Sequence, residues 1–228
     1  LKMRKGNPVT YAHSMRYLWI PIIALFTLGL LIVTNSTHSS LAQSTENCRP
    51  SNINTNNWST DFCNGDVDFS EFLSGGPPKD GIPSVANPAM ESIADASEWL
   101  SDRSPVIAVE IDGEARAYPQ AVLMWHEIAN DEIAGVPIAV TFCPLCNSSI
   151  TYDRRVNGEV LDFGVSGLLR NSDMVMFDRQ TDSWWQQLTG IGIVGNYADT
   201  VLDFVPSQVI SFCQFTDRYP QGVVMSRE

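Results

Sequence analysis

Basic residues are scarce in this sequence, and the few present are unevenly placed. The 228 residues include 14 Lys and Arg against 26 Asp and Glu. Residues 1–42 hold four of the basic side chains and no acidic one, so residues 43–228 carry ten basic and 26 acidic side chains, a net charge of −16. Such a surface repels phosphate backbones and anionic lipid. Nucleic acid is therefore not an expected partner, which leaves cations, basic proteins and neutral small molecules.

Other features are missing as well. The sequence has no internal repeat, no long linker and no low-complexity tract, which favours one domain with its own core after residue 42. Histidine is rare, because His13 and His38 lie in or beside the first 42 residues and only His126 remains beyond them. The chain has one C-x-x-C, at Cys143 and Cys146, and no second one to complete a four-cysteine metal site.

Residues 1–42 have the composition of an export signal. Four basic residues precede the uncharged run "YLWIPIIALFTLGLLIVT" (Tyr17–Thr34), and small residues around "SLAQ" suit cleavage after Ala42. The apolar run is nearly long enough to span a bilayer, so an uncleaved membrane anchor is the alternative. Both interpretations place the rest of the chain in the periplasm, at the cell surface or outside the cell.

The chain ends at "GVVMSRE" without a closing element, and we expect the domain over 66–228 to be truncated there.

All five cysteines follow residue 42, in the part expected to be exported. Cys48 and Cys63 flank a polar, Asn-rich stretch, and outside the cytosol they are expected to form a disulfide. The segment 43–65 is therefore predicted to be a flexible lead-in that this disulfide closes. Cys213 is left over, either as a small buried residue or as a reactive or ligating thiol.

Strand patterns dominate the rest of the chain. Residues 105–119 alternate around Asp112-Gly113, and "RRVNGEV" carries Asn157-Gly158, and both pairs are typical of tight hairpin turns. Residues 136–142 are almost all apolar, which indicates a buried strand. Helical spacing predicts helices over 88–100 and over "QAVLMWHEIAND" (120–131). These elements predict a single β-rich α+β domain of several antiparallel hairpins with a few short helices.

The stretch "TFCPLCNSSITYDR" (141–154) raises the main chemical question. Residues after Cys146 alternate and include β-branched side chains, so a strand is expected there and not the helix that activates a thioredoxin-type thiol. A C-P-x-C turn between strands resembles the knuckle of zinc ribbons and rubredoxins. In such a turn the residue after the second cysteine takes a positive φ, which Asn147 tolerates.

Four roles remain open for this pair. The first is a zinc or copper site in which Cys143, Cys146 and His126 are the ligands. The second is a disulfide that exchanges with the thiols of substrates in the cell envelope. The third is a nucleophilic Cys143 activated by His126. The fourth is a structural disulfide in a non-catalytic interaction domain.

A polar run, "SGLLRNSDMVMFDRQTDSWW", supplies side chains that can bind a ligand or orient one. We expect its functional members to face one cleft together with the cysteines. These residues are Arg170, Asn171, Asp173, Asp178 and Arg179. The same residue types are also ordinary turn formers and surface ion pairs.

Several long stretches together resemble a known family. "GGPPKDGIP", "EARAYP", "WHEIAND", "PIAVTFCPLCNSSITYDR" and "FGVSGLLRNSDMVMFDRQTDSWWQQ" are similar to the bacterial and archaeal domain of unknown function 3179 (DUF3179). The resemblance implies that the "WHE", "CPLC" and "LLRNSD…DRQ" stretches belong to one site, and it implies no established activity. This chain departs from the family pattern at Asn147, where glycine is usual, and at "SFCQF", which argues against Cys213 as a required ligand.

Overall fold

The computed structural model describes residues 48–227, and residues 48–228 form one compact unit. The predicted signal or anchor in residues 1–42 lies outside the described residues. Within residues 48–227, none of the helices has the length and apolar character needed to cross a membrane.

Short helices and many strands make up the chain, as the sequence patterns predict. The helical segments are η1 (Phe69–Glu71), α2 (Ile93–Ala96), α3 (Gln120–His126) and α4 (Phe212–Arg218). The strands are β1 (Phe72–Ser74), β2 (Val85–Ala86), β3 (Met90–Ser92), β4 (Pro105–Ile111), β5 (Glu114–Pro119), β6 (Ile128–Ile133), β7 (Val136–Cys143), β8 (Ser148–Asp153), β9 (Arg155–Val156), β10 (Glu159–Val160), β11 (Phe163–Arg170), β12 (Asp173–Asp178), β13 (Trp184–Gln186), β14 (Gly192–Val194), β15 (Phe204–Val205), β16 (Ser207–Ser211) and β17 (Val223–Met225).

Three five-stranded sheets contain most of the strands. We name them after a central strand: the β4 sheet (order β16-β4-β5-β17-β3), the β7 sheet (β15-β8-β7-β6-β2) and the β12 sheet (β1-β11-β12-β13-β14). Among these strands, the pairings of β17 with β5 and of β2 with β6 are parallel, and the others are antiparallel. The β-rich α+β fold is confirmed.

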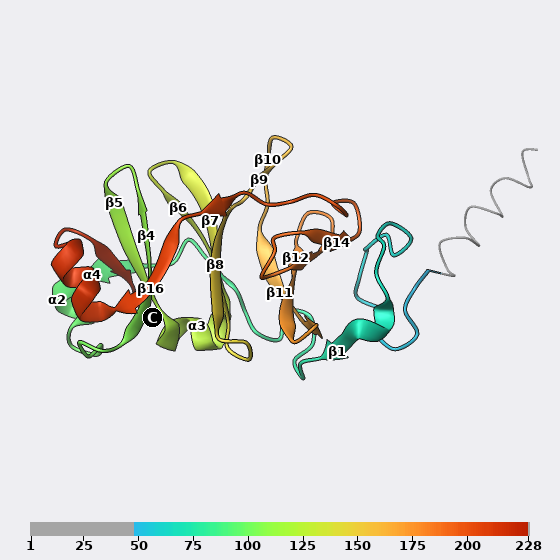
Figure 1. The fold of residues 1–228 in the computed structure, drawn as a ribbon, viewed down its shortest axis with the longest axis horizontal. Helices are drawn as coiled ribbons and strands as arrows, with labels where there is room; N and C mark the ends of the chain where they lie inside the picture. The colour runs from blue at the N-terminus through green and yellow to red at the C-terminus, as the bar shows by residue number, and fades with distance from the viewer. Residues whose placement is uncertain (1–47, 228) are drawn as a thin grey trace, which may run out of the picture. The chain divides into compact units, whose positions relative to one another are not determined.

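The sheets stack as layers (Figure 1). α2 and α4 cover one face of the β4 sheet through Ala96, Phe212 and Phe215. The other face of that sheet packs on the β7 sheet, whose opposite face packs on the β12 sheet. The β7 sheet is thus buried on both sides, which explains why residues 136–142 read as a continuous apolar run.

Both hairpin predictions are confirmed. Ile111 pairs with Glu114 across Asp112-Gly113, and β9 pairs with β10 across Asn157-Gly158. The turn residues adopt positive φ, 50° at Asp112 and 52° at Asn157. Asn, Asp and Gly tolerate this conformation, and for that reason these dipeptides predict the turns.

The helix predictions need correction. Residues 90–92 form β3, which pairs with β17, so the helix expected over 88–100 is reduced to α2. Its N-terminus is set by Ser92, whose side chain accepts from the Asp95 N–H. α3 ends at His126 because Glu127 adopts a φ of 57°, and the chain continues as β6.

The lead-in is packed against the domain. Cys48 and Cys63 form the predicted disulfide. Trp58 and Phe62 are 6% and 5% exposed, and they join Trp184 of β13 in a core cluster on the outer face of the β12 sheet. The segment is therefore part of the fold from Cys48 onward, in contrast to the flexible lead-in that its Asn-rich composition suggested.

Candidate functional site

The C-P-L-C turn joins two central strands of the β7 sheet. Cys143 is the last residue of β7 and pairs with Ser148, the first residue of β8. Asn147 has a φ of 49°, so both the strand after Cys146 and the positive φ are confirmed. The two sulfurs are joined in a disulfide with Cα atoms 5.6 Å apart.

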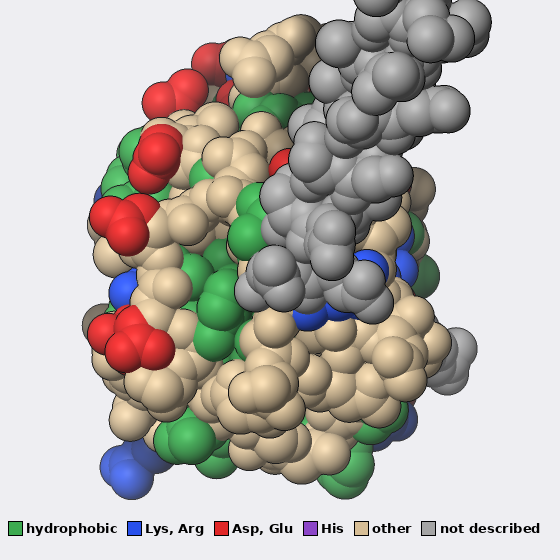
Figure 2. All heavy atoms as spheres, turned by 90° about the vertical axis from the view of Figure 1, so that its right-hand side faces the viewer, with side chains coloured by type: hydrophobic (Ala, Val, Ile, Leu, Met, Phe, Trp, Pro, Cys, Tyr) green, Lys and Arg blue, Asp and Glu red, His purple; other side chains and the backbone are tan. Residues whose placement is uncertain are grey.

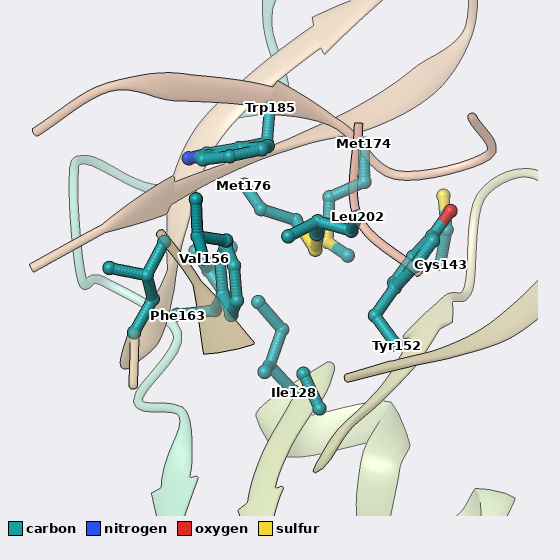
Figure 3. Packing of buried hydrophobic residues seen from close by; sticks show 12 residues of the cluster. Ile128, Cys143, Tyr152, Val156, Phe163, Met174, Met176, Trp185 and Leu202 are labelled. Atoms are coloured by element: carbon teal, nitrogen blue, oxygen red, sulfur yellow. The ribbon is translucent and has the colours of Figure 1, made fainter. Parts of the chain in front are cut away.

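The two cysteines differ in access to solvent. Cys143 is 1% exposed and belongs to the core between the β7 and β12 sheets, where Tyr152 stands beside it (Figure 3). Cys146 is half-buried, and Leu145 between them is 72% exposed. A reactant that approaches from solvent therefore reaches Cys146 before Cys143.

Polar groups from the β7 and β12 sheets surround the Cys146 sulfur. Its Sγ lies 3.6 Å from Oδ1 of Asp173 and 3.1 Å from Oγ of Ser148. Ser148 donates to Oε1 of Gln187 (2.9 Å), and Gln187 donates through Nε2 to Oγ1 of Thr141 (2.8 Å). This chain of hydrogen bonds fixes the Ser148 hydroxyl next to the sulfur.

Asp173 is held by one carboxylate oxygen and presents the other to the sulfur. It is 3% exposed, and its Oδ2 accepts from the Leu188 N–H (3.0 Å) and from Nε2 of Gln186 (2.5 Å). Asp173 is the first residue of β12. It comes directly after the turn at Asn171 and Ser172, which have φ values of 53° and 63°. Burial, and to a smaller extent the negative charge of Asp173, raises the pKa of nearby Tyr152.

Three ligand atoms meet at this point. The Cys143 and Cys146 sulfurs and a carboxylate oxygen of Asp173 all lie within 4.8 Å of one another. Thiolates and a carboxylate are zinc ligands, so the group could hold a metal once the disulfide is reduced. His126 is not a member of this group, and its Nδ1 lies 2.8 Å from the carbonyl oxygen of Pro83.

The other residues predicted to bind a ligand lie elsewhere. Arg170 pairs with Glu71 (2.8 Å) beside the Asp173 end of β12, and Asn171 forms the adjacent turn. Asp178 and Arg179 lie at the opposite end of β12, about 16 Å from Asp173 at the usual rise per residue.

At that end Asp178 is fully buried and accepts from Nε1 of Trp185 (2.9 Å), and Arg179 pairs with Asp80 (2.8 Å). The structure does not bring these two residues to the cysteines. Cys213 is an exposed free cysteine on α4, apart from the group of ligand atoms.

One unusual residue was not selected from the sequence. Glu127 follows His126, has a φ of 57° and is half-buried, and its carbonyl accepts from the Phe142 N–H (2.7 Å). Burial raises the pKa of its carboxyl group to about 7. The sequence signal for this residue is the "WHE" motif, in which His126 is the predicted ligand.

Fold and site together define a layered β-rich domain with a disulfide-bonded C-P-L-C turn beside a buried carboxylate. The model of the family described as "Protein of unknown function (DUF3179)" matches residues 79–228, and the chain belongs to this family. No curated protein and no solved structure matches the chain.

Proposed function

We propose that the Cys143–Cys146 pair is the redox centre of an exported thiol–disulfide oxidoreductase, and that Cys146 is the sulfur that exchanges with the substrate. The observation that carries this proposal is the contact of 3.6 Å between the half-buried Cys146 sulfur and the free Oδ1 of Asp173. A buried carboxylate with one oxygen fixed and the other on a sulfur is placed to accept and return a thiol proton. The Cys48–Cys63 disulfide matches an oxidising compartment, which supports export.

The exchange balances in two steps. A substrate thiolate attacks Sγ of Cys146, forms a mixed disulfide and leaves the bonding electron pair on Sγ of Cys143, which takes up a proton. A second thiolate of the substrate attacks the substrate sulfur of the mixed disulfide and releases Cys146, which is protonated through Asp173. The substrate dithiol loses two electrons and becomes a disulfide, while Cys143 and Cys146 gain them as thiols. The reverse sequence reduces a substrate disulfide.

Trapping tests which sulfur exchanges. In a Cys213→Ser background, which removes the exposed free thiol, Cys143→Ser should form a stable mixed disulfide with oxidised glutathione. Cys146→Ser should react much more slowly because the remaining thiol at Cys143 is buried. Intact mass spectrometry over time measures both. Faster capture at Cys143 would contradict the assignment of Cys146.

A redox titration separates catalysis from a structural role. We expect Cys143–Cys146 to equilibrate with glutathione buffers at a potential above about −300 mV, the region below which structural disulfides lie. Cys48–Cys63 in the same protein is the internal control and should stay oxidised. If both disulfides resist reduction alike, Cys143–Cys146 is a structural element of an interaction domain.

Metal binding by the reduced pair is the second candidate function. It is favoured because ligand atoms of Cys143, Cys146 and Asp173 lie close together. Such a site offers three protein ligands and an open position, an arrangement that suits zinc, while the two thiolates also suit copper. His126 was the ligand expected from the sequence.

The metal content of the reduced full-length chain tests the candidate. About one zinc or copper per chain, lost in Asp173→Asn and kept in His126→Ala, would support the ligands that the structure groups. Loss in His126→Ala alone would support the set expected from the sequence. Protein that takes up neither metal would contradict both.

A further inference from the structure

A cavity of about 290 Å³ lies on the other side of the β12 sheet from the cysteines. Its walls come from three segments far apart in the sequence: the lead-in around Asn52–Trp58, the turn at Pro77–Lys79, and the bulge at Ser166–Leu168 of β11. This volume is just below the roughly 300–1,000 Å³ of ordinary small-molecule sites, which favours a small ligand. The lead-in lies outside the family-matched residues, so this cavity is partly built by sequence that the family model does not include.

The walls are fixed by covalent and steric constraints. The disulfide between Cys48 and Cys63 closes the lead-in, and Trp58 anchors that segment in the core. In the bulge, Gly167 has a φ of 76°, and a Cβ there would lie 2.0 Å from the carbonyl oxygen of Pro77. Only glycine allows the two segments to approach this closely. The cavity is therefore preformed and needs no closure around a ligand.

The lining carries no uncompensated charge. Among the described residues that line it, Lys79 has the only ionisable side chain, and Nζ of Lys79 pairs with Oδ1 of Asp182 at 2.6 Å. The same ammonium lies 4.4 Å from the ring centroid of Trp58 and 4.6 Å from that of Phe177. Figure 2 views the molecule from the side of the lead-in, and uncharged polar groups and backbone make up most of the visible face. An anionic ligand would find its cation already neutralised.

Polar groups without partners line the same cavity. Trp58 is 6% exposed, and its indole N–H is not among the buried side-chain atoms without a partner in residues 48–227, so this donor is accessible to solvent. A donor that reaches solvent at the wall of a cavity can also donate to a ligand that displaces water. The side-chain amide of Asn57 is also unpaired in this part of the chain, and Asn52 uses only its Nδ2, on the carbonyl of Phe69. The cavity thus offers both donors and acceptors.

We propose that this cavity binds an uncharged saccharide of one or two rings. Sugar hydroxyls both donate and accept, as the amide groups of Asn52 and Asn57 require. The C–H faces of a sugar ring pack on apolar walls, which Pro77 and Pro78 provide. The neutral lining selects against sugar phosphates and uronic acids. This proposal is independent of the redox function, because the cavity and the cysteines lie on opposite faces of the β12 sheet.

Ligand-observed NMR and calorimetry on the full-length chain test the proposal. The neutral probes are glucose, N-acetylglucosamine, maltose and N,N′-diacetylchitobiose, and the charged probes are glucose 6-phosphate and glucuronate. We expect saturable binding of at least one neutral probe and weaker binding of the charged ones. Asn57→Ala changes an exposed residue and should fold like the parent chain. Trp58→Phe keeps an aromatic ring in the core and removes the N–H, and urea unfolding of this variant checks that the wall of the cavity is intact. Each should weaken binding about fivefold to tenfold, the effect of one lost hydrogen bond.

Asn196→Ala, at an exposed asparagine away from the cavity, is the matched control and should bind like the parent chain. The proposal is overturned if no neutral probe binds with a Kd below about 10 mM. It is also overturned if the charged probes bind better, or if Trp58→Phe and Asn57→Ala bind as tightly as Asn196→Ala.

Discussion

Oδ1 of Asp173 lies 3.6 Å from Sγ of Cys146, and Oδ2 of the same carboxylate accepts from the Leu188 N–H. The carboxylate is thereby held through Oδ2 by a backbone N–H and by Nε2 of Gln186, which leaves Oδ1 directed at the sulfur. A carboxylate held in this way suits the proton transfer that we propose between Asp173 and Cys146.

Asp173→Asn should slow the reoxidation of the reduced pair by oxidised glutathione about 100-fold at neutral pH, because Cys146 loses its proton acceptor. Stopped-flow mixing followed by rapid alkylation measures the rate. Asp178→Asn, at the other buried end of β12, should lower stability and leave this rate unchanged. Faster exchange in Asp173→Asn would mean that the carboxylate acts only by repelling the thiolate, and the proposed proton transfer would be wrong.

Gly167→Ala should destabilise the domain more than Gly135→Ala does. Both glycines have nearly the same φ, 76° and 77°, but a Cβ at Gly135 meets nothing within 4 Å. The backbone conformation alone costs about 1–2 kcal/mol at either position. The excess at Gly167 measures the contact with Pro77, and urea unfolding of the two variants gives it directly. Equal losses would show that the Gly167–Pro77 approach can relax.

Glu127 should make the domain less stable as the pH rises from about 4.5 to about 7. Burial raises its pKa from the ordinary 4.5 to about 7, so in this range the folded state holds a proton that the unfolded state has released. The stabilisation is fully present below pH 4.5 and is lost as the pH passes 7. Urea unfolding across this range should show a steeper decline for the parent chain than for Glu127→Gln. Parallel curves would contradict the assignment to Glu127.

Replacing both Cys48 and Cys63 by serine should lower the free energy of unfolding by about 3 kcal/mol. This is the effect expected when a disulfide closes a loop between cysteines with a sequence separation of 15. Because this loop forms one wall of the cavity, saccharide binding should weaken in parallel. The glutathione equilibrium of Cys143–Cys146 should not change. A loss of redox activity in the double variant would show that the two regions are coupled.

The sequence predicts best the features that depend on neighbouring residues. The Asp112-Gly113 and Asn157-Gly158 turns, and the positive φ of Asn147, follow from local conformational preferences. The buried strand β7 follows from its continuous apolar run.

Features that depend on distant contacts were predicted less well. The sequence placed Asp173 in one cleft with the cysteines, but it did not separate Asp173 from Asp178 and Arg179, because only the packing of the β12 sheet on the β7 sheet decides which of them reaches Cys146. The helix expected over 88–100 lost its first turns to pairing with β17, because tertiary hydrogen bonds override helical spacing. Trp58 and Phe62 are isolated among polar residues, and no periodic pattern marks them as core.

The packing of the lead-in has a practical consequence for choosing where an expressed domain should begin. A protein that starts at Lys79, where the family match begins, lacks Trp58, Phe62 and Phe72. The sheet face left behind contains Val175, Phe177 and Trp184, all nearly inaccessible to solvent in the intact chain. An apolar face of this kind promotes aggregation. Starting at or before Cys48 keeps that face covered and keeps both cysteines of the first disulfide.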